Sequence, residues 1–157
     1  MTQPKAPSAA SDVTIDADPD TVYALLTDLP TLAELGDEIA TMEWRKGNSA
    51  QPGAMFRGQN RNGGKKWTTT CTVTDADPGR VFAFDVRSLV VPVSHWRYDI
   101  EPVDGGCRVT ERTWDRRPGW FSKVAPLATG VKDRAAANSE HIEATLRRLK
   151  EKAETKS

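Results

Sequence analysis

Glu111 is the residue whose position most suggests chemistry, because it continues an apolar stripe. Residues 107–115 alternate along a predicted strand, and one side of that strand carries Cys107, Val109, Glu111 and Thr113. A carboxylate is costly to bury without a partner, and burial would raise its pKa into the range useful for an acid or a base. The alternative is that Glu111 lies near a sheet edge and pairs with Arg57 or Arg97.

Tyr98 is the second candidate catalytic residue. It shares the apolar side of predicted strand 94–102 with Trp96 and Ile100. In a cavity, its phenol would orient a ligand oxygen or donate a proton to an enolate. The alternative is a core tyrosine whose hydroxyl is hydrogen-bonded within the protein.

Side chains that share the inward side of predicted strands, or the inner line of a predicted helix, are candidate ligand contacts. They are Phe56, Asn60, Trp67, Thr69, Cys71, Trp96, Val109, Thr113, Asn138 and Ile142. Two of them keep an alternative. Asn60 would line a cavity or simply begin a turn, and Asn138 would bind a ligand carbonyl or a nearby strand.

Histidine, metal and cofactor chemistry are not expected. His95 shares the polar side of its strand, and His141 lies one position off the apolar line of its helix. Cys71 and Cys107 form no CxxC pair, so they are expected as buried reduced thiols, with a disulfide left open. The chain has no cluster with metal-ligand spacing, no nucleophile elbow and no phosphate-binding glycine loop.

The elements that must position these residues begin with a strand at 12–17. Asp18 and Pro19 then start a helix that Pro30 is expected to end, and residues 31–35 form a second short helix before Gly36. Six strands with period-two alternation follow, joined by Gly, Pro and Asp turns, which predicts an antiparallel meander. They are 39–47, 54–61, 66–74, 80–87, 94–102 and 107–115.

A long amphipathic helix is expected from about Val131, and it supplies the partner for the apolar face of the sheet. Residues 120–129 contain Pro126 and precede Gly130, so they are expected as a looser lead-in or a lid. Basic residues near the end of the helix are expected to be solvated. They are Arg147, Arg148, Lys150 and Lys152.

Size and charge bound the function. The 157 residues suit one domain, here 11–152, with a flexible tail at 1–10 and a short tail at 153–157. Lys and Arg total 22 and Asp and Glu total 22, so the zero net charge supplies no long-range field for nucleic acid. No apolar run reaches the length of a membrane span, so stable membrane insertion is not expected. The expected compartment is the cytoplasm.

The order of these elements, together with a set of short motifs, resembles the helix-grip fold of the SRPBCC superfamily. The motifs lie at 13–15, 18–19, 22–26, 52–58, 67, 77–80, 82–84, 96–98 and 106–111. The chain looks like the bacterial branch labelled polyketide cyclase/dehydrase or lipid-transport-like. That resemblance implies an α+β fold, in which a bent antiparallel sheet wraps a long C-terminal helix around a cavity. It does not imply one activity.

Three functions follow as hypotheses. The first is binding of a small hydrophobic ligand, lipid or polyketide-like, by a monomer or homodimer without cofactor. The second is a cofactor-independent cyclase or aromatase that uses Glu111 or Tyr98, against which the sequence shows no obvious catalytic pair. The third is an interaction or stress-response protein, favoured if Trp114, Trp120 and Phe121 form an exposed patch.

Overall fold

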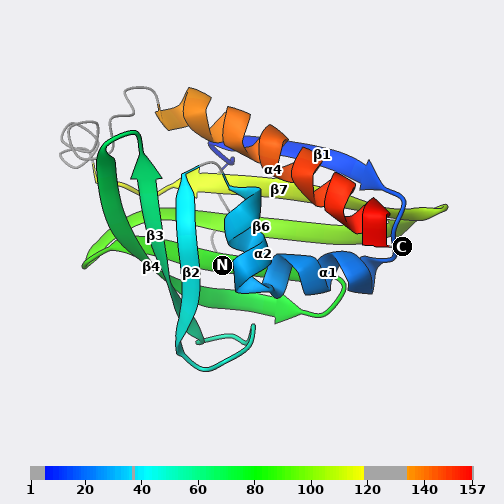
Figure 1. Cartoon of the computed structure of the whole chain (residues 1–157), viewed down its shortest axis with the longest axis horizontal. Coiled ribbons are helices and arrows are strands. Elements are labelled where there is room, and N and C mark those ends of the chain that lie inside the picture. Colours follow the sequence, from blue (N-terminus) through cyan, green and yellow to red (C-terminus); the bar gives the residue numbers. More distant parts are fainter. Residues whose placement is uncertain (1–5, 37, 119–133, 157) are drawn as a thin grey trace.

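One antiparallel sheet and one long helix dominate the structure. A computed structural model describes residues 6–36, 38–118 and 134–156. Its seven strands follow the order β1-β7-β6-β5-β4-β3-β2, so only the first strand leaves the simple meander, by pairing with the last. Helix α4 crosses one face of the sheet, and α1 and α2 lie beside it on that face (Figure 1). The other face of the sheet carries no helix in Figure 1.

The elements have the following bounds. They are β1 Ala9–Ile15, α1 Pro19–Thr27, α2 Leu29–Leu35, β2 Ile39–Lys46, β3 Met55–Asn62, β4 Lys65–Asp77, β5 Val81–Ser88, β6 Val91–Val103, β7 Gly106–Asp115 and α4 Arg134–Lys156. This is the predicted order of elements. The observed β4 and β6 are longer than the predicted strands.

The sheet is strongly bent. In Figure 1, β1 and β7 run along the long axis next to α4, whereas β2 and β3 stand across that direction. Register shifts mark the bend, one between Val73 and Asp75 on β4 and one between Val86 and Arg87 on β5. Such bulges increase local twist, so the sheet curls around a concave face instead of lying flat against the helix.

The two short helices meet at Asp28. Its side chain accepts hydrogen bonds from the backbone N–H and the hydroxyl of Thr31, which caps the start of α2. Pro30 therefore lies in the first turn of α2, where its missing N–H is not needed. The expectation that Pro30 ends the first helix was wrong, because α1 already ends at Thr27.

Helix α4 is fixed to the rest of the fold by both apolar and polar contacts. Its buried face includes Ile142, Leu146 and Leu149. The Leu35 carbonyl at the end of α2 accepts hydrogen bonds from the Thr145 hydroxyl (3.2 Å) and the Arg148 guanidinium (2.9 Å). These bonds satisfy a helix-terminal carbonyl and hold α2 against α4.

Both predicted tails need correction at their inner boundaries. Strand β1 begins at Ala9, and the Ser8 N–H donates to the Thr113 carbonyl, so the last residues of the expected N-terminal tail belong to the sheet. Helix α4 continues to Lys156 and buries Ala153, so 153–156 are helical.

Some predictions concern residues whose structure is not described. The lead-in or lid expected at 120–129, and the start of the helix near 131, lie outside the described residues. Trp120 and Phe121, two members of the proposed apolar patch, also lie outside the described residues. The third member, Trp114, stacks on His95 with ring centroids 5.4 Å apart.

Candidate functional site

A cavity of about 230 Å³ lies between the concave face of the sheet, the α2–β2 connection and α4. Its described lining comes from α2, every strand from β2 to β7, the residues that follow β7, and α4. An engineered apolar cavity of about 150 Å³ already holds benzene. The space therefore suits a ligand larger than a single aromatic ring.

Eight of the predicted site residues line this cavity. They are Asn60, Trp67, Thr69, Cys71, Trp96, Tyr98, Glu111 and Asn138. The other four are outside its described lining and almost fully buried, so they form the packed core beside the cavity. They are Phe56, Val109, Thr113 and Ile142. Thr113 donates a hydrogen bond to the His95 carbonyl at 3.1 Å, which ties its hydroxyl to the neighbouring strand.

Glu111 and Tyr98 form a buried pair in the cavity wall. They face each other as partners in the register of β6 and β7, and both line the cavity. The Tyr98 hydroxyl donates a hydrogen bond to the Glu111 carboxyl group. The Glu111 side chain is 2% exposed, and its Oε1 atom has no hydrogen-bond partner among the described residues. The sheet edge considered from the sequence does not apply, because β7 lies between β1 and β6, and Arg97 donates to Asp99 instead.

The burial of this pair disfavours the charged form of both groups. Desolvation raises the pKa of Glu111 to about 8, even though the hydrogen bond from Tyr98 lowers it. The pKa of Tyr98 is raised well above its usual value by desolvation and by the nearby carboxylate. Near neutral pH, Glu111 is therefore largely a neutral carboxylic acid, able to donate a hydrogen bond.

Two pairs of polar side chains on the strands that line the cavity are hydrogen-bonded within the pair. The Asn60 amide donates to the Thr69 hydroxyl at 3.0 Å, and the Trp96 indole donates to the Ser94 hydroxyl at 2.9 Å. Phe84, Val86 and Met42 add apolar surface. Among these strand residues, the Glu111 carboxyl thus stands out as a polar group left for a ligand.

His141 lines the cavity, which corrects the expectation that it lies off the inner face of its helix. Its Nδ1 is 3.6 Å from Glu38 Oε1, and both side chains are mostly buried. The spacing Asn138, His141 and Thr145 places all three on one helix face, and all three line the cavity. That spacing was the signal in the sequence, and the apolar line alone did not reveal it.

Two further polar residues, Asp115 and Arg117, were not expected at the site. Asp115 is the last residue of β7, Arg117 follows it, and both line the cavity. The Arg117 guanidinium donates to both Asp115 carboxylate oxygens, at 3.0 and 2.7 Å, and its side chain is only 12% exposed. This bidentate geometry is among the strongest that arginine makes, so the charge of Arg117 is matched within the protein.

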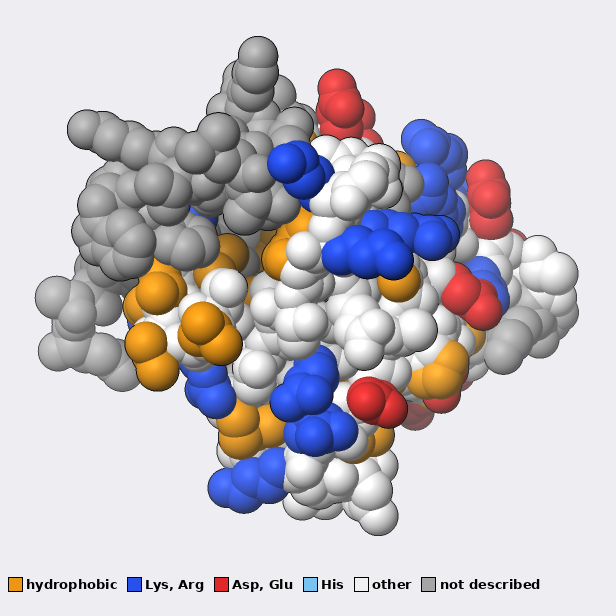
Figure 2. Space-filling model, turned by 60° about the vertical axis from the view of Figure 1, so that its left-hand side comes forward, with side chains coloured by type: hydrophobic (Ala, Val, Ile, Leu, Met, Phe, Trp, Pro, Cys, Tyr) orange, Lys and Arg blue, Asp and Glu red, His pale blue; other side chains and the backbone are white. Residues whose placement is uncertain are grey.

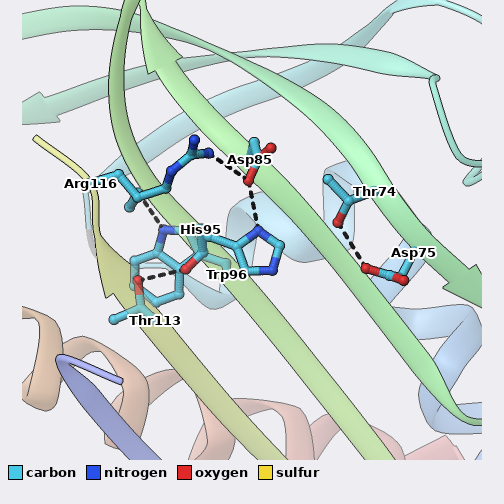
Figure 3. Close-up of polar contacts among 8 residues, drawn as sticks. Thr74, Asp75, Asp85, His95, Trp96, Thr113 and Arg116 are labelled. Atoms are coloured by element: carbon cyan, nitrogen blue, oxygen red, sulfur yellow. Dashed lines mark hydrogen bonds and ion pairs between the residues drawn. The ribbon is translucent and has the colours of Figure 1, made fainter. Parts of the chain in front are cut away.

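His95 lies on the other side of the sheet, as its parity predicts. Its Nδ1 is 2.7 Å from Asp85 Oδ1, and the Arg116 guanidinium is 3.0 Å from the same oxygen (Figure 3). This cluster is on the convex face, away from the cavity lining. It shows no link to the Glu111–Tyr98 pair.

The described residues give little support for other kinds of site. Cys71 and Cys107 are buried free thiols, and burial raises the pKa of Cys71 to about 12, so its thiolate is disfavoured. No group of three metal-ligating side chains occurs within the described part of the chain. Within the same residues, no helix combines the length and apolar character needed to cross a membrane.

A bent antiparallel sheet wrapped around a long C-terminal helix, with two short helices after the first strand, defines the helix-grip class of proteins. Residues 6–154 match the family described as polyketide cyclase / dehydrase and lipid transport, and the chain belongs to that family. The expected SRPBCC membership is thereby confirmed. No curated protein matches the sequence.

Solved structures share this fold at low sequence identity. The di-domain ARO/CYC StfQ from the steffimycin biosynthetic pathway is 16% identical, with a TM-score of 0.72, and the match covers 94% of this chain and 50% of that one. The polyketide_cyc-like protein Cgl2372 from Corynebacterium glutamicum is 25% identical, with a TM-score of 0.65 and coverage of 98% and 95%. Ara h 8.0201 is 13% identical, with a TM-score of 0.67 and coverage of 93% and 96%.

Proposed function

We propose that the chain binds a neutral, hydrophobic small molecule whose oxygen accepts a hydrogen bond from protonated Glu111. The observation that carries this proposal is the buried Glu111 Oε1 atom, without a partner among the described residues, in the wall of a largely apolar cavity. An orphaned buried polar atom is costly, so a ligand that satisfies it gains both affinity and orientation. Ketones, lactones and phenolic compounds have such an oxygen.

A neutral ligand is favoured over an anionic one by the charges of the described lining. Arg117 is already paired with Asp115, and His141 lies close to the carboxylate of Glu38. A ligand carboxylate would have to compete with Asp115 for Arg117, and it would be desolvated in doing so. A neutral carbonyl needs only the donor that Glu111 supplies.

Binding of prodan, a neutral naphthyl ketone with environment-sensitive fluorescence, tests the proposal. Thr69→Phe would place a large ring in the cavity and should abolish saturable binding, because Thr69 lines the cavity. Thr68→Phe is the matched control, since Thr68 is exposed and neighbouring strand residues point to opposite faces. Equal prodan binding by both variants would contradict a ligand site in this cavity.

We propose proton transfer at an enolisable carbon as a second candidate function, of the cyclase or aromatase kind. The observation that favours it is a titratable pair within hydrogen-bond reach, Glu111 and Tyr98, on the wall of the cavity. Ionised Glu111 would take a proton from the carbon next to a ketone, and the Tyr98 hydroxyl would stabilise the enolate oxygen. This role needs the carboxylate, whereas the binding role needs the carboxylic acid.

Deuterium exchange at the α-carbons of a bound aromatic methyl ketone, followed by NMR, tests the second candidate. Catalysed exchange should rise as pH increases through about 8, where Glu111 ionises, and Glu111→Gln should abolish it. If exchange proceeds only at its rate in buffer while the ketone still binds, the catalytic role is wrong and the binding role stands.

A further inference from the structure

The turn between β5 and β6 is apolar and fully in solvent. Leu89 and Val90 form this two-residue turn, and these two large hydrophobic residues are 86% and 90% exposed. The neighbouring Pro92 is also exposed. Two-residue hairpin turns usually carry Gly, Asn or Asp, which tolerate their backbone angles and suit water. Leucine and valine therefore suit neither the backbone angles of this turn nor its exposure to water.

Leu89 also adopts an unfavourable backbone conformation. Its φ is +56°, and no other non-glycine residue in the described part of the chain has a positive φ. The first position of such a turn favours glycine, because a Cβ is strained there. A leucine that is both strained and exposed contributes nothing to the fold, which points to a role for its side chain outside the fold.

The turn lies next to the cavity. Ser88 and Val93, on either side of it, line the cavity, as does Arg117 beyond the end of β7. In the antiparallel sheet, the β3–β4 turn is at this same end, whereas the β4–β5 and β6–β7 turns are at the opposite end. An occupant that covers Leu89 would thus sit next to the cavity.

The distribution of charge differs between the two ends, although the chain as a whole is neutral. The β3–β4 turn and its flanks carry exposed cations without an acid between them. They are Arg61, Lys65 and Lys66. The opposite end carries both signs: Asp77 at the end of β4 pairs with Arg80 at 3.7 Å, Asp104 lies in the β6–β7 turn, and Asp20 lies against Gly79. Figure 2 looks toward the cavity end and shows a cluster of hydrophobic side chains, with several Lys and Arg side chains on the same face.

We propose that the cavity end of the chain docks reversibly on an anionic lipid bilayer, with Leu89 and Val90 inserted among the acyl chains and Arg61, Lys65 and Lys66 facing the headgroups. An apolar tip ringed by cations is complementary to a surface with an apolar interior and anionic headgroups. Docking would place this end of the cavity lining close to the bilayer. Exchange of a ligand between bilayer and cavity rests on the proposed function, whereas docking itself does not.

Other occupants fit these features less well. A second copy of the chain, bound through the same surface, would bring Lys65 and Lys66 against their own counterparts. Protein partners are held mainly by aromatic and arginine side chains that fill pockets, whereas Leu89 and Val90 are short aliphatic groups at a protruding tip. A bilayer requires no complementary pocket.

Co-sedimentation with vesicles of phosphatidylcholine, with and without phosphatidylserine, tests the proposal at low and high salt. The full chain should bind the vesicles that contain phosphatidylserine, and salt should weaken binding. Leu89→Gly with Val90→Ser restores favoured turn residues and should weaken binding more than about tenfold, because two apolar side chains are lost. If that double variant does not fold, Val90→Ser alone makes the comparison.

The contribution of the basic residues to vesicle binding can be tested with a matched control. Lys65→Glu with Lys66→Glu should weaken binding by more than about tenfold, since each cation near the surface contributes about fivefold. Arg45→Glu with Lys46→Glu makes the same change in charge at the other end of β2, so these two substitutions should leave binding unchanged. An equal loss of vesicle binding in both double variants would contradict the proposed orientation.

Three results would overturn docking on a bilayer. They are failure of the native chain to bind phosphatidylserine vesicles, unchanged binding by the turn variant, and retention on immobilised polyglutamate without vesicle binding, which would indicate an acidic protein partner. Prodan binding in vesicle-free buffer reports separately on the cavity. If it persists while vesicle binding fails, docking is wrong and the proposed ligand site stands.

Discussion

The Tyr98 hydroxyl donates a hydrogen bond to the Glu111 carboxyl group from the position directly opposite on the neighbouring strand. Both side chains are buried, so the two groups share one desolvated site on the cavity wall. Their protonation is therefore linked, and a change in either residue should be felt by the other.

Replacement of Glu111 should change how stability depends on pH. The pKa of Glu111 is about 8 in the folded chain, whereas the ordinary pKa of this group is 4.5. Between these values the unfolded chain binds fewer protons than the folded chain, so the free energy of unfolding falls as pH rises. Glu111→Gln cannot ionise and should lose this part of the slope, which amounts to roughly 3 kcal/mol between about pH 5 and pH 8.

Urea unfolding of the native chain and of Glu111→Gln at those two pH values measures this difference. Glu101→Gln is the control, because Glu101 is exposed and pairs with Arg108 on the surface, at 3.0 Å. The account would be wrong if Glu111→Gln and Glu101→Gln followed the same pH dependence as the native chain.

Tyr98→Phe should raise the pKa of Glu111 further. The lost hydrogen bond from Tyr98 is the interaction that lowers this pKa, so desolvation would act without opposition. The variant should also lose about 1–3 kcal/mol of stability, because the carboxyl group loses a buried partner. NMR titration of the side-chain carboxyl carbon of Glu111 measures the shift, with Tyr23→Phe on α1 as a control. A downward shift in Tyr98→Phe would contradict the assigned hydrogen bond.

Leu89→Gly should stabilise the chain slightly. A left-handed residue with a Cβ costs about 1–2 kcal/mol, and the extra freedom of glycine in the unfolded chain offsets about 0.5–1 kcal/mol of that. A net gain of about 0.5 kcal/mol is expected from chemical unfolding. Leu89→Ala keeps the Cβ at φ +56° and should show no such gain, so equal stability of the two variants would argue against strain at this turn.

Gly106→Ala should be strongly destabilising. A Cβ at Gly106 would overlap the carbonyl oxygen of Ile15, which belongs to the paired strand β1 and cannot move alone. A loss of more than about 2 kcal/mol is expected from thermal or chemical unfolding. Gly64→Ala meets open space in the β3–β4 turn and should change stability little. Similar stability of both variants would contradict the close approach of β1 to β7.

Strand parity was enough to predict part of the cavity wall. An antiparallel strand alternates its side chains, so the apolar side of residues 66–74 placed Trp67, Thr69 and Cys71 together, and all three line the cavity. Strand parity does not predict which inward side chains reach the cavity and which are packed beneath it. Phe56 shares the inner side but is packed beneath the cavity, because the bend of the sheet decides which inward residues keep open space beside them.

The Tyr98–Glu111 pairing was within reach of the sequence. A two-residue turn at Asp104 and Gly105 pairs Val103 with Gly106, and the same register brings Tyr98 opposite Glu111. The role of Pro30 was harder to predict, because proline is found both at the ends and at the starts of helices. Only the cap formed by Asp28 decides between the two. The positions of Asp115 and Arg117 depend on where the chain leaves β7, which no local pattern gives.

The most direct test of the account is the pH dependence of prodan binding, compared with that of 2-dimethylaminonaphthalene, which lacks the acyl oxygen. Between about pH 6.5 and 9.5, affinity for prodan should fall as Glu111 ionises with a midpoint near 8, whereas affinity for the analogue should change much less. In Glu111→Gln, whose amide still donates, prodan binding should be independent of pH. If the native chain binds both probes with the same pH dependence, Glu111 does not donate a hydrogen bond to the ligand, and the central proposal is wrong.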